Sequence, residues 1–316
     1  MANANKQAAE QISDARPRTI LVSGGTGFVG RALIKQLLAA GHKVIVLTRD
    51  PDKANVLFNG AVRSIRNITQ LASEEAVDAI VSLAGASIAG GWWTARRQTL
   101  LVDSRVNTIT ALQSWLARAT HKPAVWIQAS AIGYYGVRPA SEALDEHSAA
   151  GQGFASRLCQ RVEEAVAPIA SGVRLVTLRI GLVFDANGGA LPQLVLPFRL
   201  GVGGRMGSGQ QIISWIHLDD LLRIIERALG DHTVVGTYNA VAPDAVAQAD
   251  FARAVGRQLR RPVWLPVPAL LLRSALGELA QLFVDGQRVL PTRLQTAGFA
   301  FRYGTLDAAL AAALAG

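Results

Sequence analysis

Cysteine is almost absent from this sequence. Among 316 residues there is one, Cys159, so no disulfide can form within the chain. This excludes the class of small secreted domains that are held together by several disulfides. A single thiol suits a reducing compartment, and we expect a cytoplasmic protein.

Long apolar runs are absent as well. The longest, PVWLPVPALLL at 262–272, is too short to span a bilayer and contains prolines. Residues 1–17 are polar, include Glu10 and Asp14, and lack the apolar stretch of a signal peptide. We therefore expect residues 1–17 to form a flexible tail, and we expect no membrane partner.

Clusters of basic residues are also missing, although the net charge is +9. The arginines are scattered, and no block of Lys and Arg is interleaved with aromatic residues, so we expect no nucleic-acid partner. Two interpretations of the surplus charge stay open. It is either a solvated basic surface or an attraction to phosphate groups of a cofactor or acidic substrate.

Short apolar segments alternate with helical patterns along the first two thirds of the chain. The apolar segments are almost continuously hydrophobic, which is typical of a parallel sheet covered on both faces. They lie at 19–23, 43–49, 61–65, 78–85, 124–131 and 174–184. We predict an α/β fold, a Rossmann doubly wound parallel sheet with a smaller C-terminal substrate lobe. The predicted Rossmann domain comprises 18–184 and 214–242, and the lobe comprises 185–213 and 243–316.

The strongest motif is SGGTGFVGR at 23–31, between the first predicted strand and a helix. Glycines at this spacing allow a tight turn and the close approach of a pyrophosphate, which the helix N-terminus attracts. The sequence thus predicts dinucleotide binding by this turn, through Gly24, Gly25, Thr26, Gly27, Phe28, Val29 and Gly30.

The end of the second predicted strand indicates which dinucleotide is bound. Arg49 stands where proteins specific for NAD usually carry an acid, and a guanidinium there suits the 2′-phosphate of NADP. Thr48 adds a hydroxyl. Asp50 could be the ribose-binding acid instead, but the residues after it favour a helix cap. We predict NADP (NADPH) as the cofactor. Leu83, Ala84 and Gly85, at the end of the fourth strand, are small or apolar enough for the cofactor to pass close to the backbone.

Together these motifs resemble a known family. GGTGFVG, SLAG, SRVNTIT, SAIGYYG, GGRMGSGQQIISWIHLDDL and GFAF are similar to the extended short-chain dehydrogenase/reductases, and more narrowly to the YfcH-like group of the NAD-dependent epimerase/dehydratase superfamily. The resemblance covers roughly residues 18–315 and implies a bound nicotinamide cofactor. It also implies that Arg49 and Thr48 take the adenosine phosphate, that Leu83 and Ala84 line the adenine side, that Arg105 points toward the cofactor, and that Val183 approaches the nicotinamide.

The catalytic residues of that family are missing. Its members usually carry a Ser or Thr after the fifth strand and Tyr-x-x-x-Lys on the next helix, where the tyrosine is the acid/base. Aligned through Tyr135-Gly136, these positions fall on Ala131, Phe154 and Leu158. A different proton donor is then needed, and we predict Tyr135, with Ser130 as the second candidate and Tyr134 beside them. Packing roles for the tyrosines stay open.

The prediction of the substrate-binding residues rests on weaker sequence signals. The glycine-rich run FRLGVGGRMGSGQQ at 198–211 contains Arg199 and Arg205, which suit an anionic substrate such as a nucleotide-sugar diphosphate. A plain linker between the two parts of the chain stays open. Trp93, in a loop with Trp92, and Trp215 are predicted to line the cleft. The histidines show no metal-ligand spacing, and we expect no metal. The sequence therefore predicts an NADP-dependent oxidoreductase or epimerase of unknown small-molecule substrate. The alternative is a non-catalytic NADP-binding regulator, with a role in cell division as one option. The oligomeric state, including a homodimer, stays open.

Overall fold

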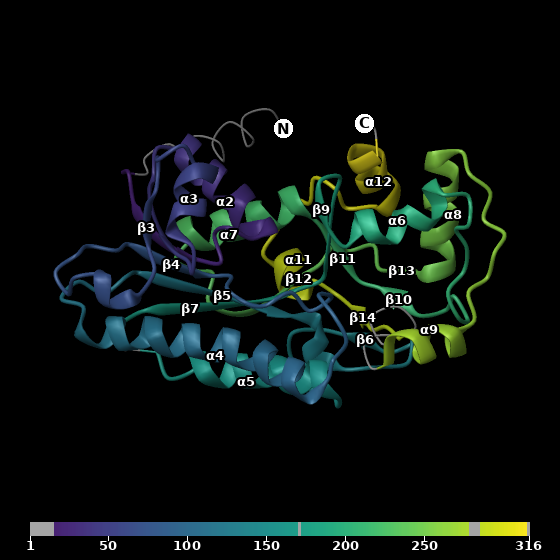
Figure 1. Cartoon of the computed structure of the whole chain (residues 1–316), viewed down its shortest axis with the longest axis horizontal. Coiled ribbons are helices and arrows are strands. Elements are labelled where there is room, and N and C mark those ends of the chain that lie inside the picture. Colours follow the sequence, from purple (N-terminus) through teal and green to yellow (C-terminus); the bar gives the residue numbers. More distant parts are fainter. Residues whose placement is uncertain (1–15, 170–171, 278–284, 315–316) are drawn as a thin grey trace.

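A seven-stranded, entirely parallel sheet forms the centre of the molecule (Figure 1). The computed structural model describes residues 16–169, 172–277 and 285–314, so nearly all of the predicted tail lies outside the described residues. The strands are β1 (Thr19–Ser23), β2 (Lys43–Leu47), β3 (Arg63–Ile65), β4 (Ala79–Ser82), β5 (Val125–Ala131), β7 (Arg174–Ile180) and β12 (Gly236–Ala240). Their order in the sheet is β12-β7-β5-β4-β1-β2-β3, the arrangement of a Rossmann-like doubly wound fold.

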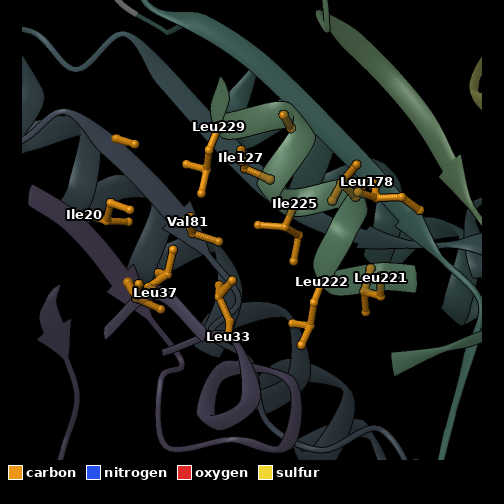
Figure 2. Close-up of a cluster of buried hydrophobic side chains, with 14 of the residues drawn as sticks. Ile20, Leu33, Leu37, Val81, Ile127, Leu178, Leu221, Leu222, Ile225 and Leu229 are labelled. Atoms are coloured by element: carbon orange, nitrogen blue, oxygen red, sulfur yellow. The ribbon is translucent and has the colours of Figure 1, made fainter. Parts of the chain in front are cut away.

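Helices cover both faces of this sheet (Figure 1). One face carries α2 (Phe28–Ala39), α3 (Pro51–Leu57) and α7 (Leu218–Gly230), whereas the other carries α4 (Ala95–Arg118) and α5 (Phe154–Val166). Figure 2 shows the first layer, where Leu33 and Leu37 of α2 and Ile225 of α7 meet apolar side chains of the strands. The predicted α/β class is thus confirmed, since every strand of this sheet except the edge strand β3 buries side chains on both of its faces.

The apolar run 174–184 is not one strand, as the sequence suggested, but two. The chain leaves the large sheet after β7 and enters β8 (Leu182–Asp185), which pairs with β9 (Gly188–Gly189) and β11 (Trp215–His217) in a separate three-stranded sheet. The break falls at Gly181, where a Cβ atom would come within 2.8 Å of the Ser214 carbonyl oxygen. The last strand of the large sheet is β12, which the sequence analysis did not identify.

A second core holds the C-terminal lobe together. It is built from α6 (Leu191–Arg199), α8 (Gln248–Leu259) and α12 (Leu306–Leu314), which pack around Phe184 and Trp215. Two short strands, β10 (Ile212–Ile213) and β13 (Val246–Ala247), pair beside it, and α9 (Ala269–Leu276) lies at its lower edge in Figure 1. The lobe therefore packs around β8, which follows the carboxyl end of β7 in the chain, and around its neighbour β11.

Short elements connect the two parts. β6 (Ala143–Leu144) pairs with β14 (Arg288–Val289), and α11 (Thr292–Thr296) follows beside β12. Two 3₁₀ turns, η1 (Ile68–Gln70) and η2 (Ile132–Tyr135), precede β4 and follow β5 respectively. No helix within the described residues is long and apolar enough to cross a membrane.

Candidate active site

The glycine-rich turn between β1 and α2 has the geometry of a phosphate-binding loop. Gly24 has a positive φ of 75°, and a Cβ atom there would lie 2.6 Å from the carbonyl carbon of Leu83. The Gly27 amide donates to the Gly24 carbonyl (3.0 Å), which closes the turn. Only glycine fits position 24, because both its backbone angle and its neighbour exclude a side chain.

The N-terminus of α2 is open to an anion. Its N-cap is Gly27, which offers no side-chain hydrogen bond, and the first turn contains no acidic residue. The first amides of the helix, those of Phe28, Val29 and Gly30, therefore lack an intrahelical acceptor, and the helix dipole favours negative charge in front of them. This is the site that a pyrophosphate would occupy, with Gly25 and Thr26 in the same turn.

Four of the predicted cofactor residues gather at the rim of this turn. Phe28, Val29, Leu83 and Val183 are partly buried side chains that pack against one apolar cluster. The Phe28 ring lies against the β8–β9 hairpin at Gly188 and Gly189, and this contact brings Val183 close to the start of α2. The structure thus unites residues from three distant segments, and their contact with a cofactor stays a prediction.

In the segment after β2, the Arg49 guanidinium has no partner among the described residues. Asp50 caps α3 by accepting from the Lys53 amide (3.1 Å), so the predicted cap is confirmed. Thr48 Oγ1 accepts from the Asp50 amide (3.3 Å). Arg49 is exposed, and its guanidinium donates no hydrogen bond to any residue in the described ranges. Arg49 is therefore available to an anionic ligand.

Arg105 supports the turn after β4. Its guanidinium donates to the carbonyls of Leu101 (2.8 Å) and Ala86 (3.1 Å), and a Cβ atom on Gly85 would lie 2.6 Å from its Cζ. Burial lowers the pKa of Arg105 from its usual value. Gly85 is thus required by the packing of Arg105, which holds the Leu83–Ala86 segment in place. A direct contact between Arg105 and the cofactor stays a prediction.

The positions of the absent tyrosine and lysine are filled by an apolar cluster. Phe154 and Leu158 are 7% and 3% exposed, and they pack with Leu101 of α4 and with Trp93. The rings of Trp93 and Phe154 meet edge to face at 5.1 Å. Trp93 therefore does not line an open cleft, as predicted, but seals the place where the usual acid/base would stand. Its indole also donates to the Ile88 carbonyl (3.0 Å).

Ser130 is held inside a partly buried polar network. Its hydroxyl donates to Glu163 Oε1 (2.7 Å). Glu163 forms a two-point ion pair with Arg179, with distances of 3.0 Å from Nε and 2.8 Å from Nη2. Burial raises the pKa of the Cys159 thiol to about 11. Because the proton of Ser130 is already donated, this placement does not fit the predicted catalytic role.

Tyr135 is fully buried and belongs to the same network. Its hydroxyl donates to Asn239 Oδ1 (2.7 Å) and accepts from Arg179 Nη1 (3.0 Å). Burial raises the pKa of the Tyr135 phenol, and Arg179 opposes that shift. The prediction that Tyr135 gives a proton to substrate does not fit this geometry, since the side chain does not reach solvent and its hydroxyl is engaged on both sides.

Tyr134 differs from its neighbour. Its side chain is partly exposed, and its hydroxyl makes no hydrogen bond to a residue that the structure describes. The Arg179 guanidinium lies over the Tyr134 ring, 3.4 Å from the centroid, and the Tyr135 ring meets it edge to face at 5.4 Å. The contacts with Arg179 and Tyr135 hold the ring of Tyr134 in place, and its hydroxyl stays available for a hydrogen bond to a ligand.

Glu163, Arg179 and Asn239 were not identified from the sequence. Arg179 and Asn239 are adjacent in register on β7 and β12, and Ser130 is adjacent to Arg179 on β5. One signal was present. A charged residue inside the apolar run RLVTLRIGLVF needs a buried partner, because an unpaired charge in such a strand is costly. The ion pair with Glu163 more than offsets the effect of burial, so the pKa of Arg179 lies above its usual value.

The predicted substrate residues separate into two groups. Trp215 is fully buried, stacks on Phe184 at 5.4 Å and donates to the Asp244 carbonyl (2.7 Å), so it belongs to the lobe core and not to a cleft. Arg199 and Arg205 are exposed, and neither guanidinium donates to a residue in the described part of the chain. Their role in substrate binding stays a prediction.

His217 is a helix cap. Its Nδ1 accepts from the Asp219 amide (3.2 Å) at the start of α7. Its ring lies 3.8 Å from that of Tyr303, and burial lowers the pKa of His217.

Within the described ranges no group of three or more metal-ligating side chains comes together. An open groove of about 550 Å³ between α4 and α5 contains Arg157 and Arg161 in its wall. Phe154 and Leu158 form part of the same wall, so their cluster borders this groove, whereas Trp93 does not line it.

Comparison with known proteins agrees with this architecture. Residues 20–240 match the NAD dependent epimerase/dehydratase family, and residues 267–313 match a domain of unknown function. The chain is 36% identical over 296 residues to the epimerase family protein SDR39U1 of Bos taurus, covering 92% of this chain and 98% of that protein. It is 34% identical over 304 residues to the epimerase family protein YfhF of Bacillus subtilis, covering 94% and 98%.

Two solved structures are similar along most of the chain. The human epimerase family protein SDR39U1, crystallised with NADPH, has a TM-score of 0.84 and 33% identity, and the match covers 92% of this chain and 97% of that one. A nucleoside-diphosphate sugar epimerase from Corynebacterium glutamicum has a TM-score of 0.76 and 31% identity, and the match covers 98% of this chain and 62% of that one.

Proposed function

The chain belongs to the NAD dependent epimerase/dehydratase family, and we propose that it is an oxidoreductase or epimerase that uses NADPH. Its substrate would be a small carbonyl compound or a nucleotide sugar. The observation that carries the cofactor assignment is the closed glycine turn at Gly24, with the uncapped N-terminus of α2 behind it and the free guanidinium of Arg49 beside it. The human relative was crystallised with NADPH, which supports the same assignment.

The preference for NADPH depends on Arg49 in this proposal. We expect Arg49→Asp to weaken NADPH binding by about 10- to 150-fold, because one charged hydrogen-bond partner of the 2′-phosphate is worth about 1.5–3 kcal/mol. NADH binding should change little. The measurement is a fluorescence titration of both cofactors.

Arg261→Asp provides the matched control. Arg261 is exposed and unpaired within the described residues, and it lies in the lobe, so the same change in net charge should leave NADPH affinity intact. Equal affinity of the unmodified protein for NADPH and NADH would contradict the assignment.

Turnover needs a proton donor other than the usual tyrosine. The cofactor supplies the hydride, and the chain must position the substrate and move a proton. We assign the proton to the Tyr134 hydroxyl, which is the phenol at the end of β5 that is partly exposed and free of internal hydrogen bonds. Arg179 over its ring holds it in place and stabilises negative charge as the proton leaves.

The two adjacent tyrosines give opposite predictions. Tyr134→Phe should lower turnover by at least ~100-fold, the low end for a general acid, with stability and NADPH affinity nearly unchanged. Tyr135→Phe should lower the free energy of unfolding by about 1–3 kcal/mol, because Asn239 and Arg179 each lose a buried partner, with turnover little changed. Steady-state NADPH oxidation and urea unfolding measure the two effects, and full activity of Tyr134→Phe would remove Tyr134 from the mechanism.

A second candidate function is a regulator that binds NADPH without turnover. The apolar cluster of Trp93, Phe154 and Leu158 favours it, because the place of the usual proton relay is closed by packing. A metabolite screen distinguishes the two candidate functions. Protein-free cell extract would be added to the protein with NADPH or NADP⁺, and a change in absorbance that Tyr134→Phe abolishes would support the enzyme.

A further inference from the structure

Exposed apolar side chains gather on one part of the C-terminal lobe. Of the twelve large hydrophobic side chains that are exposed among the described residues, seven lie in two short segments, 196–202 and 264–271. We name these two segments, together with Arg260 and Arg261 shortly before the second, the lobe edge. Its apolar members are Leu196, Leu200, Val202, Trp264, Leu265, Leu270 and Leu271. Single exposed hydrophobic residues are ordinary, but a concentration of this kind marks a site of interaction.

The two segments form one continuous surface. The Trp264 indole donates to the Gly201 carbonyl (3.2 Å), and the loop that follows α6 exchanges two backbone hydrogen bonds with Val267, both of 2.8 Å. The segment between α8 and α9 runs along the outer side of the lobe, away from the large sheet (Figure 1). The lobe edge therefore faces outward and is distant from the glycine turn.

The lobe edge carries positive charge only. Residues 251–277 contain five arginines and no acid, and residues 186–216 contain two arginines and no acid. Arg199, Arg260 and Arg261 are exposed, and none of their guanidinium groups is paired with a described residue. Elsewhere in the lobe Arg253 and Arg257 pair with Asp250 and Asp307. Free cations beside exposed leucines and a tryptophan suit an anionic partner with an apolar interior.

We propose that the lobe edge docks on the surface of an anionic lipid bilayer. Tryptophan and leucine enter the interface between head groups and acyl chains, and arginine attracts anionic head groups. A second copy of the chain fits less well, because two lobe edges would bring arginines against arginines with no acid between them. The predicted lack of a membrane partner rested on the lack of a spanning segment, and docking requires none.

Vesicle flotation tests this docking directly. The full chain with NADPH bound is mixed with vesicles of phosphatidylcholine alone or of phosphatidylcholine with phosphatidylglycerol. We expect flotation only with phosphatidylglycerol, and weaker flotation at high salt. The double variant Arg260→Gln with Arg261→Gln should bind about 25-fold more weakly, at about fivefold per charge. Trp264→Ser with Leu270→Ser should bind at least about tenfold more weakly.

The two exposed tryptophans provide a matched control. Trp92 and Trp264 are each 65% exposed, but Trp92 lies in the loop before α4, outside the lobe edge. Brominated lipids should quench the fluorescence of the parent protein and of Trp92→Phe, and Trp264→Phe should lose that quenching. All of these variants change exposed side chains, so NADPH affinity should equal that of the parent, and thermal unfolding should change little even where the Trp264 variants lose the exposed hydrogen bond to Gly201.

Three results would overturn the proposal. They are no flotation with phosphatidylglycerol, flotation that the lobe-edge variants leave unchanged, and a dimer in sedimentation that Trp264→Ser dissociates. None of these measurements depends on turnover or on the proposed enzyme.

Discussion

Restoring the missing tyrosine and lysine by Phe154→Tyr with Leu158→Lys should destabilise the protein and add no activity. Both positions are buried in the cluster with Trp93 and Leu101. Replacing Leu158 removes its packing and places an ammonium among apolar groups, which together should lower the free energy of unfolding by about 2–4 kcal/mol. The new phenol would meet the Trp93 ring and not a substrate.

The pH dependence of this loss has a definite sign. Burial in apolar surroundings lowers the pKa of a lysine in the folded state, so the unfolded chain binds more protons between that pKa and the ordinary value of about 10.4. Stability of Leu158→Lys should therefore rise with pH across this interval, relative to the parent. Urea unfolding at several pH values measures the trend.

Leu158→Met serves as the matched control, since a swap that conserves volume in a core usually costs less than about 1.5 kcal/mol. A double variant that is as stable as the parent and oxidises NADPH faster would show that the place of the relay is open, and would contradict the sealed cluster.

Local patterns predicted the large sheet well. Each of its first six strands was an apolar run bounded by turn residues, and the glycine spacing at 24–30 fixed the turn from β1 to α2. The prediction of one strand at 174–184 was wrong. Continuous hydrophobicity does not show that the chain passes at Gly181 from the large sheet into a second sheet. β12 was missed because GTYNA contains few apolar residues, although three of its five residues are buried.

The candidate site was predicted only where one short segment defines it. The Asp50 cap and the glycine turn are local, whereas the partners of Ser130, Tyr135 and Trp93 come from distant segments. A single tyrosine or tryptophan in the sequence therefore does not reveal whether it faces a cleft or a core. The decisive partners, Glu163 and Arg179, are joined by an ion pair that spans a helix and a strand.

The ion pair between Arg179 and Glu163 should be the most sensitive point of the structure. Arg179→Met leaves the Glu163 carboxylate in a largely buried site, with Ser130 as its one remaining hydrogen-bond donor among the described residues, and removes a donor from Tyr135. We expect the free energy of unfolding to fall by about 3–5 kcal/mol, the usual result of breaking one side of a buried pair. Urea unfolding at neutral pH measures it.

A surface pair gives the comparison. Arg253 and Asp250 form an exposed ion pair on α8, and Arg253→Met should cost less than about 1 kcal/mol, because water screens both charges.

The paired change Arg179→Met with Glu163→Leu then separates charge from packing. Removing both charges abolishes the uncompensated carboxylate, so the double variant should be more stable than Arg179→Met alone, even though it has lost one more native side chain. Its turnover should stay low, because the ring of Tyr134 has lost the guanidinium that holds it. If the double variant is less stable than the single one, the pair acts by packing and not by charge. If turnover returns with stability, Arg179 serves the fold alone and has no part in positioning Tyr134.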